Sequence, residues 1–394
     1  MPPSGTSRVR LLGGIDELRA VRRQWIDLAR RALEANPFYE ESFLMPLLEH
    51  RGWIAGLRVA VVAEGERLIG LLPLVRRSIA PGGWPPLWRS AFAPDQPHGF
   101  LATPLLDRDR AATALATLLD ALDRGMFGTG LLELFGYADD GPCARLLQAT
   151  LTDRRQPHQP LDGWRRGLFR PQRCFESYLQ SCLEPKRIRE LRRQRRRLEE
   201  LGPVRLRRLA PDEPFEAWCE HFLAIEKAGW KGRKGTALAS RADDAAFFRA
   251  MCAQRHREGR LLFEALELGD RPISLSVALL AAGEPSAAFV FKITHDESMR
   301  TFGPGVLLEY VQFEAYHAEK GPIHWADSCT GQGREHLDRL WAERRHLGHL
   351  LIAPRGLGGS AVLASFRAAL GVRRATEGAV DRARRSLARL YRQR

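Results

Sequence analysis

Cysteine and lysine are scarce in this chain of 394 residues, and the cysteine pattern narrows the possible functions. The six cysteines form no C-x-x-C pair, so neither a zinc site nor a dithiol redox centre is indicated. Scattered single cysteines are typical of free thiols in a reducing compartment. The motif His346-x-x-His349 has no apparent third ligand, and we therefore expect no metal.

Long apolar runs are missing as well. The longest run, 273–282, is interrupted by two serines, whereas a membrane helix needs about 20 apolar residues. The stretch 1–20 lacks the apolar core of a signal peptide. These absences predict a soluble, cytoplasmic protein without a transmembrane segment.

Basic charge is plentiful, but it is concentrated in two segments. The net charge is +14, and lysine supplies only six of the 61 basic residues, which indicates a bias in base composition more than selection for nucleic-acid binding. Residues 185–209 carry a net charge of +8 and residues 344–394 one of +10, which leaves −4 for the rest. The body of the protein is therefore not basic.

The chain is too long for one ordinary core, so we expect two domains. The first half predicts mixed α/β structure with an early antiparallel hairpin: helices over 15–33, 109–122 and 142–151, and strands over 56–63, 67–75 and 131–135. Residues 152–163, with two prolines and many polar side chains, predict a linker between the halves.

The second half opens with a basic helix over 185–201, for which we expect a solvated arginine face. Its apolar side chains share the opposite face: Ile188, Leu191, Leu198 and Leu201. The glycines of 226–232 predict a loop. Short turns then predict an antiparallel meander, with helices and a last strand around it: strands 260–268, 273–281, 287–294 and 323–326, and helices 215–228, 243–257 and 306–319.

The third meander strand leads into an R-x-x-G-x-G motif, Arg300-Thr301-Phe302-Gly303-Pro304-Gly305. Its glycines let backbone amides approach a ligand closely, and the following helix points its first N–H groups and positive dipole end to the same place. Alone, so short a motif fits an ordinary turn equally well. The strands before it and the helix after it favour a cradle for an anion such as a pyrophosphate, with Arg300 adding a full charge.

This order of elements is similar to the GNAT acyltransferase fold. Residues 185–345 resemble its CelD-like subfamily, acetyltransferases associated with cellulose and exopolysaccharide synthesis. The features that carry the resemblance are Arg192-Arg193, Phe247-Phe248, Asp270-Arg271-Pro272-Ile273, Phe302 to Leu308, and Trp341. Asn36-Pro37-Phe38 and the first hairpin resemble the N-terminal portion of the same family.

The resemblance implies an α/β (α+β) fold of two GNAT-like domains in tandem, as in Fem-type transferases. Each would be a mixed, mostly antiparallel sheet flanked by helices. We expect an N-terminal domain over 1–163, a catalytic domain over 164–345 and a basic helical tail over 346–394. The first half has no R-x-x-G-x-G motif, so we expect it to lack a cofactor site.

The resemblance further implies an acyltransferase, in the first place an N-acetyltransferase, whose acceptor amine or hydroxyl attacks a thioester directly. Acetyl-CoA or another acyl-CoA would be the co-substrate. The residues implied in holding it are Arg300, Thr301, Phe302, Gly303, Pro304, Gly305 and Val306, with the backbone near Ile293 and His295 polarising the thioester.

Three ionisable residues are candidates for catalysis. Glu226 is the first choice for the base that deprotonates the acceptor, against the alternative of a solvated glutamate at a helix end. Asp327 ends the last strand beside the expected acceptor entrance, although aspartate there also caps helices and turns. Lys292, in an apolar strand, faces either the acceptor cleft or solvent. Trp230 and Lys231 are expected to shape the acceptor pocket.

Two other functions stay open. A Fem-like transferase would take its acyl group from aminoacyl-tRNA, whose phosphates the basic helix and tail would hold. A non-catalytic GNAT module in polysaccharide biosynthesis would keep the fold without the reaction. The acceptor, a small molecule, saccharide or peptide, is not specified, because residues 328–334 depart from the family's Gly and Tyr-Lys pattern. The sequence does not indicate an oligomeric state.

Overall fold

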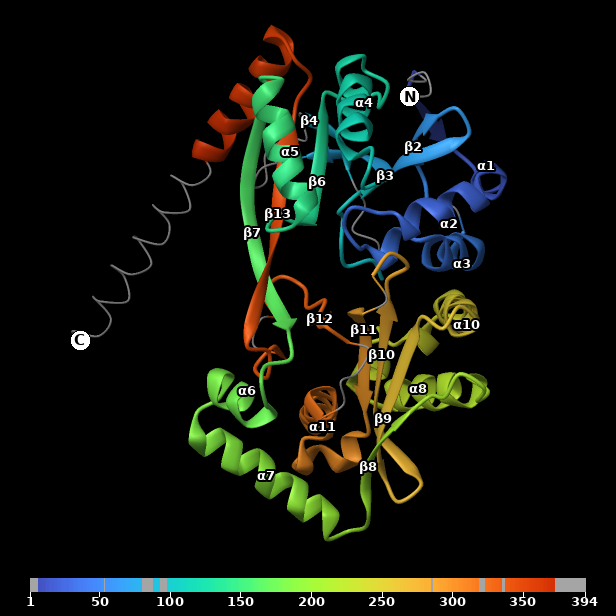
Figure 1. Ribbon diagram of the computed structural model, residues 1–394, viewed down its shortest axis with the longest axis vertical. Coiled ribbons are helices and arrows are strands. Elements are labelled where there is room, and N and C mark those ends of the chain that lie inside the picture. The colour runs from blue at the N-terminus through green and yellow to red at the C-terminus, as the bar shows by residue number, and fades with distance from the viewer. Residues whose placement is uncertain are drawn as a thin grey trace, which may run out of the picture.

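The computed structural model describes residues 6–52, 54–79, 88–92, 98–284, 286–318, 323–334 and 337–372. One sheet of 13 strands runs through both halves (Figure 1), in the order β1-β2-β3-β4-β6-β13-β7-β12-β11-β10-β9-β8, with β5 paired to β3. Helices pack along this sheet, and the expected mixed α/β fold is confirmed.

The strands are β1 Arg8–Leu12, β2 Leu57–Glu64, β3 Arg67–Ile79, β4 Trp88–Phe92, β5 Leu105–Leu106, β6 Leu131–Ala138, β7 His158–Phe169, β8 Val204–Arg208, β9 Leu261–Leu268, β10 Arg271–Leu280, β11 Ala287–His295, β12 Trp325–Asp327 and β13 Glu343–Ile352. The α-helices are α1 Ile15–Ala20, α2 Arg22–Arg30, α3 Glu41–Arg51, α4 Ala111–Asp123, α5 Pro142–Asp153, α6 Phe175–Cys182, α7 Pro185–Glu199, α8 Glu216–Ala228, α9 Trp230–Arg233, α10 Ala242–Arg257 and α11 Pro304–Ala318. Three short 3-10 helices are η1 Pro37–Tyr39, η2 Leu238–Ser240 and η3 Glu297–Phe302.

In the first half, the predicted helices and strands are present as far as the end of α5, and β1, α3, β4 and β5 are additional elements that were not predicted. β2 and β3 form the expected hairpin, and the helix predicted over 15–33 is divided at Val21 into α1 and α2. The linker predicted over 152–163 is wrong, because α5 continues to Asp153 and β7 begins at His158. Most side chains in the first part of β7 are partly or fully exposed, so its polar composition reflects a half-solvated strand.

The last strand, β13, lies in the middle of the sheet, where it pairs antiparallel with β6 and β7 (Figure 1). The helical tail predicted from residue 346 is therefore wrong for residues 346–352. Helix begins only at residue 357, and residues 373–394 lie outside the described part. Arg345, just before the predicted tail, is 6% exposed and forms ion pairs with buried carboxylates, so this part of the basic C-terminal segment is not solvated.

The second half contains the predicted three-stranded meander as β9, β10 and β11, and β8, a strand that was not predicted, pairs antiparallel with β9. Leu201, predicted on the buried face of the basic helix, lies beyond the end of α7 and is 59% exposed. The prediction of a loop over 226–232 is also wrong. Residues 226–228 are the end of α8, and Trp230–Arg233 form α9. A Cβ on Gly232 would lie 1.7 Å from the carbonyl oxygen of Lys227, so glycine here permits close packing.

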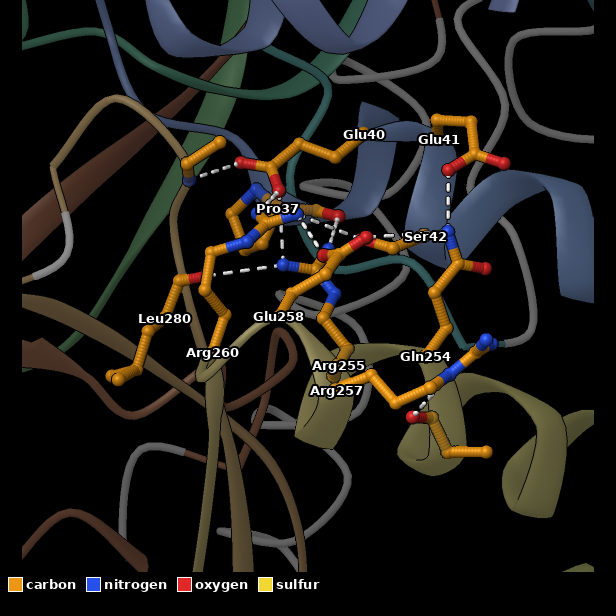
Figure 2. Close-up of polar contacts among 12 residues, drawn as sticks. Pro37, Glu40, Glu41, Ser42, Gln254, Arg255, Arg257, Glu258, Arg260 and Leu280 are labelled. Carbon is orange, nitrogen blue, oxygen red and sulfur yellow. Dashed lines mark hydrogen bonds and ion pairs between the residues drawn. The ribbon is translucent and has the colours of Figure 1, made fainter. Parts of the chain in front are cut away.

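Buried polar contacts around Glu40 join the two halves (Figure 2). Its carboxylate accepts a hydrogen bond from Arg255 Nη1 at 2.9 Å and one from the N–H of Ala282 at 2.8 Å, and it also pairs with Arg260. Arg255 is 0% exposed, and its Nη2 donates to the carbonyl of Pro37 at 2.7 Å. A buried guanidinium is stable only when it is paired, so these contacts fix how the halves meet.

Apolar packing crosses the same junction. Phe38 and Phe289 have ring centroids 6.2 Å apart, and Phe43 and Phe247 have centroids 5.4 Å apart. One continuous core contains side chains of both halves, and a second core lies under α11. The described part of the chain has no helix long and apolar enough to cross a membrane, and no cluster of His, Cys, Asp or Glu suited to a metal ion.

Candidate active site

β11 and β12 run parallel, but they are paired only over a short distance. Their pairing ends at Phe289 opposite Asp327, while β11 continues to His295. Among the described residues, no strand covers the β12 side of residues 290–295. The other side of β11 stays paired with β10, with a bulge in the register. The parting of the two strands leaves backbone groups of β11 available to a ligand.

The R-x-x-G-x-G motif forms a compact turn at the end of β11. After η3, Gly303 adopts the left-handed conformation with φ of 62°, and α11 begins at Pro304. Glycine takes this conformation without the cost that a Cβ imposes. The first N–H groups of α11 have no acceptor within the helix, and they point to the turn together with the positive end of the helix dipole. Arg300 is exposed beside them.

The basic helix α7 packs against this turn. A Cβ on Gly303 would lie 3.4 Å from Gln194 Oε1, and the Arg197 guanidinium is 5.6 Å from the centre of the Phe302 ring. The predicted amphipathic helix is confirmed by its buried side chains, Ile188, Leu191 and Leu198. Several of its arginines pair with glutamates: Arg192 with Glu176, Arg193 with Glu190, and Arg195 with Glu199. Part of the charge of α7 is thus neutralised locally.

The turn is suited to a pyrophosphate. A Cβ on Gly305 would lie 3.4 Å from Nδ1 of His295, so this glycine lies directly beside the imidazole at the end of β11. Burial lowers the pKa of His295, which leaves its imidazole neutral at neutral pH. Thr301 is exposed, whereas Phe302 and Val306 pack partly buried against the core under α11. A glycine turn at a helix start is a common way to bind an anion.

Glu226, Lys231 and Ile293 come together at β11. Lys231 Nζ donates to Glu226 Oε1 at 2.9 Å and to the carbonyl oxygen of Ile293 at 2.9 Å. The second carboxylate oxygen of Glu226 accepts from the N–H of Leu238 at 2.7 Å, and this side chain is 1% exposed. Both oxygens of Glu226 therefore have donors, and the carboxylate holds Lys231 against β11.

Lys292 lies next to this pair in a different environment. Its ammonium is 5.7 Å from the centre of the Phe291 ring, and the side chain is partly buried. Burial lowers the pKa of Lys292, and this effect exceeds the opposing influence of Glu226. A lysine with a lowered pKa releases and accepts a proton closer to neutral pH than a solvated one does. This makes Lys292 better suited to proton exchange than the ion-paired Glu226.

Asp327 is buried between two arginines. Arg166 Nη2 and Arg345 Nη1 donate to it at 2.8 and 2.9 Å, and the N–H of Cys329 donates at 2.9 Å. Burial alone would raise the pKa of Asp327, but Arg166 and Arg345 hold it below its usual value. Arg345 also pairs with Glu34 of the first half at 2.8 Å. These contacts tie β12 to β7 and β13 and indicate a positioning role for the aspartate.

Trp230 lies at the rim of this region and is 42% exposed. Its backbone N–H donates to Glu297 of η3, and the same carboxylate pairs with Arg233 at 2.7 Å. The start of α9 is therefore attached directly to the turn that follows β11. Through these contacts the structure brings the acceptor-side candidates, Trp230 and Lys231, close to the donor-side motif.

His98, from the first half, is a further residue of this region that was not predicted. Its Nε2 lies 3.1 Å from Asp244 Oδ1 on α10, and its ring stacks on Phe247 at a centroid distance of 5.4 Å. The side chain is 7% exposed, and Nδ1 has no hydrogen-bond partner in the described structure. Burial, followed by the charge of Lys292, lowers the pKa of His98 to about 4. A single histidine whose partner is 146 residues away gives no signal in the sequence.

The first half has a similar arrangement of strands and helix, but a carboxylate lies at its helix. β4 and β6 are parallel, as β11 and β12 are, and α4 lies between them in the chain. Just before α4, Asp107 is 0% exposed and accepts from Arg31 at 3.0 Å, Arg67 at 2.6 Å and the N–H of Asp109 at 3.1 Å. The loop that leads into α4 thus already contains a buried, paired carboxylate, whose negative charge disfavours a bound anion there.

Residues 185–345 match the family model of the GNAT acetyltransferase domain. This match bears out the resemblance for the second half, and it names no subfamily. No curated protein matches the sequence.

Solved structures of similar fold cover most of the chain. FemX is similar with a TM-score of 0.53 and 11% identity, over 88% of this chain and 98% of that one. A conserved protein of unknown function from Bacteroides thetaiotaomicron VPI-5482 has a TM-score of 0.52 and 10% identity, over 88% of this chain and 100% of that one. At such low identity the likeness shows the fold alone, and it extends over both halves.

Proposed function

We propose that the protein is an acyltransferase that uses an acyl-CoA, in the first place acetyl-CoA, at a single donor site. The observation that carries the proposal is the continuity of three features: the open edge of β11, the left-handed turn at Gly303 and the start of α11. The match of residues 185–345 to the GNAT acetyltransferase domain supports it. Asp107 at the start of α4 supports the absence of a second donor site in residues 1–163.

Backbone groups, together with the side chain of Arg300, bind and orient the donor. The first N–H groups of α11 and the guanidinium of Arg300 hold the phosphates, and the edge of β11 near Ile293 and His295 aligns the arm that carries the acyl group. A bound acyl-CoA supplies the activated acyl group. The acceptor attacks its carbonyl carbon directly, so the protein needs no covalent nucleophile. Backbone N–H groups of β11 stabilise the charge that develops on the carbonyl oxygen.

The acceptor side is built from charged groups near β11. Lys292 is our first candidate for contact with the acceptor, since burial brings its pKa closer to neutral pH. Glu226 acts through Lys231, which it holds at the carbonyl of Ile293. Trp230 contributes an exposed aromatic surface at the rim. Asp327 keeps the parting strands in place through its two arginines.

The nature of the acceptor is proposed from the resemblance alone. A CelD-like enzyme would act on a saccharide of cellulose or exopolysaccharide synthesis, and a Fem-like one on a peptide. For the domains, we propose an accessory unit over about residues 1–163 and a catalytic unit over 164–345, with β13 completing the sheet between them.

Ligand protection against thermal unfolding tests the proposal. Acetyl-CoA should raise the unfolding temperature of the wild type, and Arg300→Glu should weaken its binding about tenfold or more, because one charge-assisted contact is replaced by repulsion. Arg23→Glu, an equal charge change on the exposed face of α2, is the matched control and should behave as the wild type. No shift with the wild type, or equal shifts for both variants, would refute the proposal.

Transfer from aminoacyl-tRNA is the second candidate, and it rests on the basic helix beside the turn. Lys186, Arg187, Arg189 and Arg196 lie on α7 in addition to the arginines that pair with glutamates. If tRNA were the donor, its binding would weaken steeply with salt and would be lost when these residues are replaced by glutamate. Affinity for tRNA no greater than for an arbitrary RNA would exclude this candidate.

A further inference from the structure

A small cavity lies between α11 and the sheet, at the place where β11 and β12 part. Its volume is about 20 Å³, enough for one water molecule. Val290 and Ile293 of β11, Ala326 of β12 and Trp341 contribute to its walls. Glu309, from α11, is the only carboxylic acid in that lining.

Glu309 has few polar partners for a carboxyl group in such a place. Trp341 Nε1 donates to it at 3.3 Å, and no ion pair to it occurs among the described residues. The nearby amide of Gln312 donates instead to Glu264 on β9, whose charge Arg208 also balances. The charged group that acts on Glu309 is Asp338, whose negative charge repels a second carboxylate.

This environment makes Glu309 a neutral acid. Burial is the main cause that raises the pKa of Glu309, to about 8, and the negative charge of Asp338 acts in the same direction. The hydrogen bond from Trp341 opposes the shift only in part. At pH 7 the side chain therefore carries a proton that it can donate. The residue as a whole is partly exposed, so this proton can exchange with solvent.

The position of the cavity relates it to the donor. Gly305, at the start of α11, lies beside His295 at one end of the open edge, and Val290 is at the other end. Five residues of extended strand span about 17 Å. An acyl-CoA arm that starts at the turn and follows this edge therefore ends beside Val290, at the cavity that Glu309 lines.

We propose that Glu309 is the acid that protonates the leaving sulfur of the acyl donor, an inference that rests on the proposed acyltransferase function. As the acceptor nitrogen or oxygen forms its bond to the carbonyl carbon, the carbon–sulfur bond breaks and its electron pair goes to sulfur. The carboxyl proton of Glu309 passes to this sulfur and gives the free thiol. The carboxylate regains a proton from solvent, which has taken up the one that the acceptor lost.

The rate of thiol release at two pH values tests this role, with simple amines offered as acceptors. At saturation, the rate of the wild type relative to that of Glu309→Gln should fall about tenfold from pH 7 to pH 9, because only the protonated acid, with a pKa near 8, donates to sulfur. Glu309→Gln keeps an oxygen that accepts from Trp341 but has no proton to lose in this range. Glu314→Gln, on the partly exposed face of the same helix, is the matched control and should follow the wild type.

A second readout separates proton donation from simple contact. With amines offered as acceptors, Glu309→Gln should release thiol from acetyl-CoA about 100-fold more slowly at saturation, and its rate should lose the fall above pH 8. An unchanged rate, or an unchanged pH profile, in Glu309→Gln would overturn the assignment while the acyltransferase proposal stands. Absence of acetyl-CoA binding at either pH would overturn both.

Discussion

Replacement of His98 by glutamine should change how stability depends on pH. Glutamine places an N–H donor near the position of Nε2, so the hydrogen bond to Asp244 is kept while the titrating group is lost. In the folded protein, burial and the charge of Lys292 lower the pKa of His98 to about 4, against about 6.5 for a free histidine. The unfolded chain therefore takes up a proton more readily, and stability decreases as the pH falls from 6.5 toward 4.

The size of the effect follows from the difference between the pKa of His98 in the folded protein and in the unfolded chain. The full shift corresponds to about 3 kcal/mol, of which roughly 2.5 kcal/mol is lost by pH 4.5. Other carboxylates titrate in the same range, so the informative quantity is the difference between wild type and variant. Charged groups around His98 are Asp244 and Arg51 on the helices packed against it and Lys292 on β11, and all of them remain in the variant.

Urea unfolding followed by tryptophan fluorescence at pH 7.5 and pH 4.5 measures this difference. Between the two values the wild type should lose about 2.5 kcal/mol more than His98→Gln. His50→Gln, which alters an exposed histidine on α3, should leave the wild-type dependence unchanged. An identical loss in the wild type and in His98→Gln would show that the histidine is not held neutral at the junction of the two halves.

Further variants test other parts of the account. Asp327→Asn should lower the free energy of unfolding by about 3–5 kcal/mol, because Arg166 and Arg345 stay buried without their counter-charge; a loss below about 1 kcal/mol in urea unfolding would contradict that role. Gly232→Ala should prevent α9 from packing on the carbonyl of Lys227 and lower the unfolding temperature clearly, and an unchanged value would show that the contact relaxes freely. Lys292→Met should raise stability at neutral pH, since burial of the charged form is unfavourable, while lowering turnover; full activity would remove Lys292 from the site.

Local patterns were enough to predict most of the second half. The meander is visible because short turns separate three apolar segments, and the turn at Gly303 is visible because its glycines precede a helix. β7 and β13 escaped prediction for one physical reason. β7 and the first part of β13 are rich in polar residues, and their place in the sheet depends on pairing between strands that are distant in the chain, β13 with both β6 and β7.

The site was harder to predict than the fold, because the partners of its residues are distant in the chain. Glu226 was expected to be the base that deprotonates the acceptor, but Lys231 and the N–H of Leu238 occupy both of its carboxylate oxygens. Asp327 was predicted as a catalytic candidate, but no pattern in the sequence around it predicts its pairing with Arg166. His98 gave no signal for the same reason. Sequence patterns report on neighbours along a helix or strand, whereas these contacts cross between the halves.

The donor site itself is tested most directly by titrating acetyl-CoA into the wild type, Gly303→Ala and Gly269→Ala in a calorimeter. The two glycines have nearly equal φ values, 62° and 61°, so both substitutions impose about the same backbone strain, roughly 1–2 kcal/mol. Gly269 lies in the turn between β9 and β10, where a Cβ meets no atom within 4 Å. We predict one site in the wild type, unchanged affinity in Gly269→Ala, and binding at least about tenfold weaker in Gly303→Ala. Absence of binding in the wild type, or equal affinity in both variants, would contradict the account.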